Sequence, residues 1–154
     1  MSTEEQEDSF LSEEQEKNIV EAIKAAELQT SGEIRIHIEQ VCNKWNPLKR
    51  AKKLFHELEM DDTELQNGVL LYIASDDHKV AIFGGKAIDE KVGQLFWDDV
   101  LQQLIENFRN DYVEKGIKKA VHQIGEKLKV YFPYQEDDKN ELSDEISTHD
   151  NRNE

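Results

Sequence analysis

Three aspartates have the residue type and the spacing that could hold a metal ion. Asp76 and Asp77 form a tight turn directly after an apolar run, and Asp111 stands just before the last predicted helix. Carboxylate oxygens are the preferred ligands of hard cations such as Ca²⁺ and Mg²⁺. The residues therefore predict a divalent-cation site at Asp76, Asp77 and Asp111. The alternative is that the first two only form the turn and the third only complements a helix dipole.

The sequence contains no familiar catalytic motif. Gly84 and Gly85 lack the lysine and hydroxyl residue of a phosphate-binding loop, and no G-x-S-x-G elbow occurs. Cys42 and His37 could form a nucleophile and base pair, but five residues apart on one strand should place them on opposite faces. His78, beside the aspartates, is interpreted as an exposed turn residue rather than a ligand. No catalytic residue is assigned.

Two further charged groups are interpreted as solvated surface. An acidic loop is expected at the sheet edge away from the aspartates. A basic patch lies on the second helix, where it could also receive an acidic tail or a partner. The loop contains Asp61, Asp62 and Glu64, and the patch contains Lys49, Arg50, Lys52 and Lys53.

Periodicity and capping residues predict the elements that must position these groups. Ser12 with Gln15 forms a capping box that begins a first helix, and Asn46 with Pro47 begins a second one. Alternation over residues 34–38 predicts a strand with one polar face, and the apolar run 68–74 predicts a central strand covered on both faces. Residues 79–83 return as an antiparallel strand. The pattern then predicts a helix that starts near Gly93 and a last helix capped by Asn110.

This order of elements predicts an α/β fold, a three-layer α/β/α sandwich. Its small mixed sheet has two parallel strands, joined by a right-handed crossover, and one antiparallel hairpin strand. Ligands of such sheets lie off the carboxyl ends of the parallel strands. We expect residues 76–77, residue 111 and the acidic start of the first helix, at Glu13 and Glu14, to meet at that edge.

Charge divides the chain into three parts. The net charge of −15 comes from 34 acids and 19 bases, yet residues 16–134 carry 20 acids and 17 bases. The excess acid lies in the ends, which have few large apolar residues and cannot offset their ordering entropy. We expect disordered acidic segments at 1–9 and 135–154 around one α/β domain at 10–134.

Composition also limits the partners. No dense basic patch interleaved with aromatic residues appears, which argues against nucleic acid, and no apolar run approaches the roughly 20 residues of a membrane span. The absence of a signal peptide and the lone Cys42 fit a cytoplasmic protein. A monomer is expected.

Several stretches resemble the TPM domain family, whose name comes from thylakoid lumen phosphatase-like, photosystem-repair and receptor-modulator relatives. The similarity covers about residues 10–133 and follows the short, soluble bacterial branch. The matching stretches are residues 30–39, 54–58, 67–74, 77–83, 96–97, 107–112 and 116–117.

The resemblance implies an α/β/α sandwich, divalent-cation binding and, from some plant members, acid phosphatase activity. The turn at Asp77 and the helix start at Asp111 match family motifs, so cation binding transfers best to them, with Asp76 adjacent. Two departures stand out: Gly84 and Gly85 replace a Gly-Asp pair, and residues 7–9 replace an Asp-rich entry. Three functions stay open. The first is a non-catalytic domain that binds Ca²⁺ or Mg²⁺, with or without a protein partner. The others are a metal-assisted phosphatase and a protein-interaction adaptor.

Overall fold

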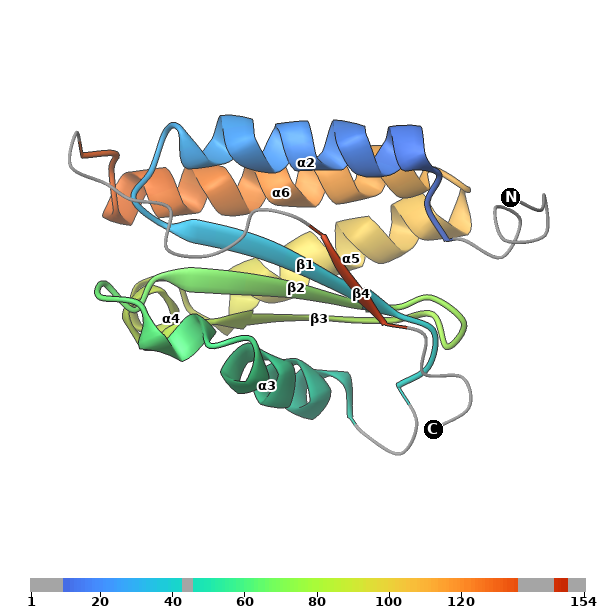
Figure 1. Ribbon diagram of the computed structural model, residues 1–154, viewed down its shortest axis with the longest axis horizontal. Coiled ribbons are helices and arrows are strands. Elements are labelled where there is room, and N and C mark those ends of the chain that lie inside the picture. The colour runs from blue at the N-terminus through green and yellow to red at the C-terminus, as the bar shows by residue number, and fades with distance from the viewer. Residues whose placement is uncertain (1–9, 43–45, 136–145, 150–154) are drawn as a thin grey trace.

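Helices cover both faces of a four-stranded sheet in the computed structural model, which describes residues 10–42, 46–135 and 146–149 (Figure 1). The elements in chain order are α2 (Glu13–Glu27), β1 (Glu33–Glu39), α3 (Pro47–Glu57), the 3-10 turn η1 (Met60–Asp62), β2 (Gly68–Ala74), β3 (Lys79–Gly84), α4 (Lys86–Val92), α5 (Gln94–Arg109), α6 (Val113–Tyr131) and β4 (Ser147–His149).

Both predicted helix starts are confirmed. The Ser12 side chain accepts a hydrogen bond from the Gln15 N–H, and the Gln15 side chain accepts one from the Ser12 N–H, which completes the capping box of α2. The Asn46 side chain accepts hydrogen bonds from the first-turn amides of α3, where Pro47 occupies the first turn. Local sequence is therefore sufficient to position the starts of these two helices.

The sheet has the strand order β3-β2-β1-β4. β1 and β2 are parallel, and β3 is antiparallel to β2, as the element order predicts. Every residue of β2 is buried, which agrees with its unbroken apolar run. This is the predicted α/β class with a small mixed sheet.

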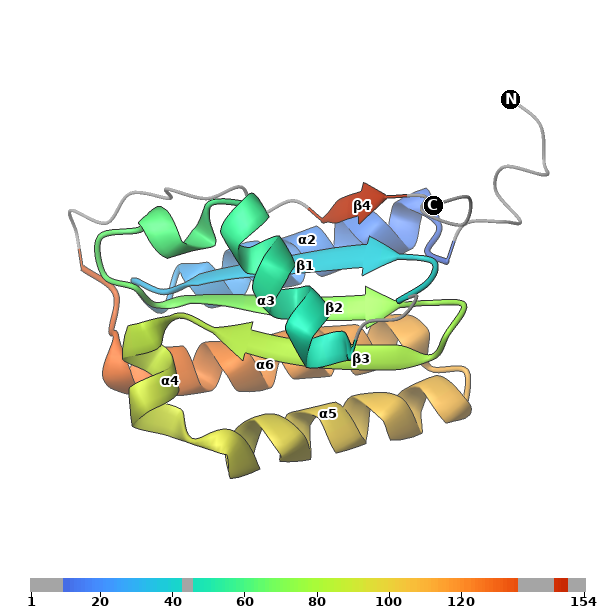
Figure 2. The same cartoon turned by 90° about the horizontal axis from the view of Figure 1, so that it is seen from below.

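The two faces of the sheet belong to separate cores. One alternating set of strand residues, including Ile36 and Leu71, packs with α2, α5 and α6. The other set, including Leu70 and Tyr72, packs with α3. Figure 2 shows α3 on one side of the strands, with α2 and α6 on the opposite side. The arrangement is the predicted three-layer sandwich.

The helix predicted to start near Gly93 is confirmed as α5, but a short helix before it was not predicted and the predicted cap of the last helix is wrong. The segment before Gly93 is already helical, as α4, and Gly93 at φ 83° separates α4 from α5. Asn110 ends α5 rather than capping the last helix, because two residues intervene before α6 begins at Val113. One of them, Asp111, has a left-handed backbone that reverses the chain.

The first strand has the predicted polar face, with Arg35, His37 and Glu39, but that face is largely buried. His37 is 6% exposed and Glu39 is fully buried, because α3 covers this face of the sheet.

A fourth strand was not anticipated. Residues 147–149 pair in parallel with β1 at residues 37–39, within a tail predicted to be disordered. The predicted N-terminal segment 1–9 and residues 136–145 and 150–154 of the tail lie outside the described residues. None of the helices among the described residues combines the length and apolar character that a membrane crossing demands.

Candidate functional site

The elements that were predicted to meet at one edge of the sheet do so. The carboxyl ends of β1 and β2, the β2–β3 turn, the start of α2 and the α5–α6 loop all lie at one end of the molecule, on the right of Figure 1. The acidic loop at Asp61 and Asp62 follows α3 at the other end, as predicted, and there the Asp61 carboxylate contacts His56 Nδ1 at 2.6 Å. The hydrogen bond from His56 lowers the pKa of Asp61.

The β2–β3 turn is fastened to the end of β1. The Ser75 and Asp76 N–H groups donate to the Glu39 and Gln40 carbonyls at 2.9 and 2.7 Å. The Asp77 carboxylate accepts a hydrogen bond from the Cys42 N–H at 2.6 Å through Oδ2. His78 follows with a left-handed φ of 54° that closes the turn. Asp77 thus helps to position the loop after β1.

Asp111 is held by the chain reversal between α5 and α6. Its φ of 63° is left-handed, and its N–H donates to the Phe108 carbonyl at 3.1 Å. The next N–H, of Tyr112, donates to the Asn107 carbonyl at 2.9 Å. The Asp111 side chain is exposed at the end of the molecule.

A cavity joins the two turns. Ser75 and His78 line it from the β2–β3 turn, and Asp111 lines it from the α5–α6 loop. Asp76 and Asp77 are exposed on the same turn but do not line this cavity. The structure therefore brings Asp111 to the turn of the two predicted aspartates without placing all three carboxylates in one cluster.

The described part of the chain contains no group of three or more histidine, cysteine, aspartate or glutamate side chains placed to hold a metal ion. Glu13 and Glu14, at the start of α2, belong to no such group either. Any cation at this edge would need backbone carbonyls or water beside the carboxylates, which are ordinary ligands of Ca²⁺ and Mg²⁺.

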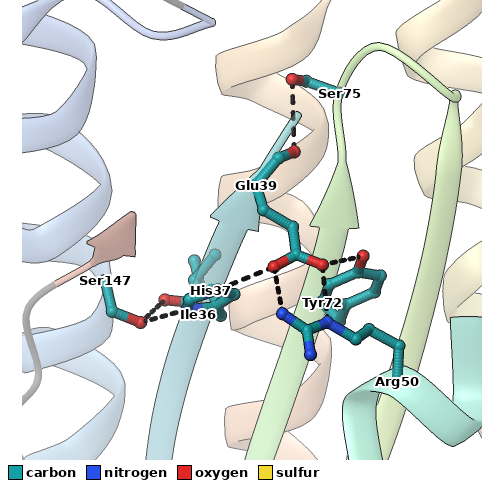
Figure 3. A network of polar contacts seen from close by, with 7 residues as sticks. All are labelled: Ile36, His37, Glu39, Arg50, Tyr72, Ser75 and Ser147. Carbon is teal, nitrogen blue, oxygen red and sulfur yellow. Dashed lines mark hydrogen bonds and ion pairs between the residues drawn. The ribbon is translucent and has the colours of Figure 1, made fainter. Parts of the chain in front are cut away.

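A buried polar network lies beneath α3, next to this edge (Figure 3). Arg50 donates two hydrogen bonds to the Glu39 carboxylate, from Nε at 2.8 Å and from an Nη at 2.7 Å. The Tyr72 hydroxyl donates to the same carboxylate at 2.5 Å, and His37 Nε2 lies 3.5 Å from it. His37 Nδ1 contacts the Ser147 hydroxyl of β4 at 2.8 Å. The network links α3, β1, β2 and β4.

The network shifts the acidity of its members. Burial alone would raise the pKa of Glu39, but hydrogen bonds from Arg50, His37 and Tyr72 and the charge of Arg50 outweigh it, and the pKa falls to about 2. Hydrogen bonding to Glu39 raises the pKa of Arg50. Burial, followed by the bond to Glu39, raises the pKa of Tyr72. Glu39 and Arg50 therefore stay ionised, and Tyr72 stays protonated.

This network was not predicted from the sequence. Arg50 was assigned to a solvated basic patch, but its side chain is 14% exposed and is paired with Glu39, whereas Lys49, Lys52 and Lys53 are exposed. One signal was present: a tyrosine inside a strand buried on both faces needs a partner for its hydroxyl.

Cys42 and His37 do not lie on opposite faces of one strand, as was predicted. β1 ends at Glu39, and Cys42 packs in the core beneath α3, on the side of the sheet that carries Tyr72 and His37. The nitrogens of His37 face Ser147 and Glu39 rather than the thiol. Trp97 is a buried core residue.

Comparison with known proteins finds solved structures that are similar to this one. The BA42 protein of the psychrophilic bacterium Bizionia argentinensis has a solution structure with a TM-score of 0.84 and 40% identity, covering 92% of this chain and 97% of that one. A search of curated proteins finds no match.

Two more distant structures share the fold alone. The N-terminal domain of a P. gingivalis protein has a TM-score of 0.68 at 18% identity, and covers 80% of each chain. The N-terminal domain of the cg2496 protein of Corynebacterium glutamicum has a TM-score of 0.61 at 11% identity, over 91% of this chain and 82% of that one. The family model of the TPM domain matches residues 5–127. The resemblance seen in the sequence is thereby confirmed, and the chain belongs to the TPM domain family.

Proposed function

We propose that this TPM domain binds a divalent cation, Ca²⁺ or Mg²⁺, at the edge where the β2–β3 turn meets the α5–α6 loop. Asp76, Asp77 and Asp111 are the proposed carboxylate ligands. The observation that supports this is that the α5–α6 loop brings Asp111 beside the β2–β3 turn that carries Asp76 and Asp77. Oxygen ligands from two neighbouring turns suit hard cations.

The donors fit such an ion only in part. The Asp77 carboxylate already accepts the Cys42 N–H through Oδ2, so its other oxygen is the one offered to a cation. Asp76 and Asp111 are exposed side chains that must be ordered on binding, at a cost in entropy. With water completing the ligand set, we expect a dissociation constant of about 10⁻⁴–10⁻³ M, as in weak calcium modules.

Amide NMR shifts measured during Ca²⁺ and Mg²⁺ titrations test the site, with ionic strength matched by NaCl. We expect saturable shifts confined to residues 75–78 and 110–112, and about tenfold weaker binding in Asp111→Asn. Asp77→Asn keeps an oxygen for the Cys42 N–H, so it removes charge while preserving the turn. Asp62→Asn, an exposed residue at the opposite end, is the matched control. Shifts that do not saturate at millimolar metal, or that weaken equally in Asp62→Asn, would overturn the proposal.

Two experiments distinguish the phosphatase and the adaptor from the proposed cation-binding function. An aryl phosphate assay tests the metal-assisted phosphatase: equal rates for the parent and the Asp77→Asn, Asp111→Asn double variant would mean that a contaminant hydrolyses the ester. A rate that falls in the double variant would favour the phosphatase. An adaptor role predicts instead that deleting residues 135–154 removes a co-purifying protein.

A further inference from the structure

The cavity at this edge extends well beyond the carboxylates. Its volume is about 630 Å³, within the roughly 300–1,000 Å³ that small-molecule sites occupy. Most of its wall is apolar and comes from four parts of the chain. These residues are Phe10, Ile73, Val80, Ile105, Phe108 and Val113.

The wall is preformed but incompletely covered. Phe10 and Phe108 meet edge to face, with ring centroids 5.8 Å apart, which fixes one side of the cavity. Val80, Ile105 and Val113 each remain partly exposed around it, whereas Ile73 at the floor is 1% exposed. An apolar group entering here would remove these surfaces from water, a favourable transfer.

The rim is basic. Lys79 of β3 and Arg109, the last residue of α5, both line the cavity and are exposed. Neither forms an ion pair within the part of the chain that the structure describes. Asp111 contributes one carboxylate to the same rim, so two basic side chains and one acidic side chain line it, with His78 beside them. Lys79 and Arg109 therefore offer an anionic group two basic partners at the mouth, in a protein whose overall charge is −15.

We propose that this cavity binds a small amphipathic anion, a short apolar chain or ring that carries one anionic head group. The apolar part would lie against Ile105, Phe108 and Val80, and the head group would pair with Lys79 and Arg109. This inference does not rest on the cation site, because it uses the apolar wall and the bases rather than Asp76 and Asp77.

Octanoate is the probe, followed by amide NMR with the full chain in EDTA. We expect saturable shifts at residues 73–80 and 105–113, and at least tenfold weaker binding of octylammonium, which has the same chain and the opposite charge. Butyrate, which has the charge without the longer chain, should not saturate. Octanoate that fails to saturate below its micelle concentration, or binds no better than octylammonium, would overturn the proposal.

Variants assign the two halves of the ligand. The double variant Lys79→Gln, Arg109→Gln should weaken octanoate binding about tenfold and leave 1-octanol unchanged, whereas Lys86→Gln, Lys91→Gln on α4 should change neither. Ile105→Trp should fill the cavity and abolish both, with Leu101→Trp, one turn earlier on α5 and outside this lining, as its control. An unchanged octanoate affinity in the charge variant would contradict the assignment even if Ile105→Trp does not fold. Asp77→Asn should retain octanoate binding, and the charge variant should retain any Ca²⁺ shifts, so the two proposals fail separately.

Discussion

At the scale of single residues, Glu39 has the largest consequence for stability. It is fully buried, yet it stays ionised because Arg50, Tyr72 and His37 surround its carboxylate. A buried ion pair stabilises little compared with an apolar pair, but removing one partner leaves an uncompensated charge. The network therefore makes α3 sensitive to any change in its partners.

Glu39→Gln should lower the free energy of unfolding at pH 7 by about 3 kcal/mol, because the Arg50 guanidinium loses its counter-charge. Urea unfolding measures this loss. Adding Arg50→Met should recover part of the stability, since the charge left without a partner is then removed. A double variant no more stable than Glu39→Gln would show that the ion pair is not the cause.

The same carboxylate predicts a dependence on pH. The pKa of Glu39 is about 2 in the folded protein against an ordinary value of 4.5. A depressed folded pKa adds stability that is complete above the unfolded value and is lost as the pH falls from about 4.5 towards 2. The loss amounts to about 2–3 kcal/mol.

Comparing urea unfolding of the parent and Glu39→Gln across this pH range isolates the effect from the other carboxylates. The gap between the two proteins should narrow as the pH falls. A gap that stays constant between pH 5 and pH 2.5 would contradict the assigned pKa.

At the scale of elements, Gly93 determines where one helix stops and the next begins. Its φ of 83° and ψ of 159° belong to a region that only glycine adopts readily. A Cβ at this position would meet nothing within 4 Å, so a substitution would be penalised by the backbone rather than by crowding.

Gly93→Ala should lower the free energy of unfolding by about 1–3 kcal/mol, because the backbone must stay strained or the α4–α5 junction must rearrange. Thermal or urea unfolding checks it. Leu95→Ala, at a side chain that is 85% exposed, should change stability by less than about 0.5 kcal/mol. Equal effects of the two variants would show that the junction tolerates a side chain.

At the scale of the whole molecule, β4 covers the outer edge of β1. It pairs with residues 37–39, and its Ser147 hydroxyl contacts both His37 and the Ile36 carbonyl. An uncovered strand edge presents backbone groups that pair readily with another chain. We therefore expect β4 to protect the sheet from association.

Deleting residues 146–154 should increase self-association of a parent that we expect to be monomeric, as measured by light scattering after size-exclusion chromatography. Salt should strengthen the effect, because it screens the repulsion between acidic chains. Deleting residues 150–154 removes the same charged side chains, Asp150, Arg152 and Glu154, but leaves β4 in place. If both truncated chains associate alike, β4 is not the protecting element.

The sequence by itself determined the elements whose signals are local. Capping residues place the starts of α2 and α3, and alternation and an apolar run identify the two parallel strands. The order of the elements implies the parallel pairing and the edge where Asp77 and Asp111 lie. Such features depend on hydrogen bonds and periodicities within a few residues, which the order of side chains encodes directly.

Only the tertiary structure decided which polar residues are buried together. Glu39, Arg50 and Tyr72 are far apart in sequence, and each alone fits a solvated position or a core, until α3 packs onto β1 and β2. The tertiary structure also decided the pairing of β4, because its partner β1 lies more than 100 residues earlier in the chain. It likewise formed the cavity, whose lining residues come from four segments. Burial and long-range contact depend on how the elements pack, and local sequence patterns carry little of that information.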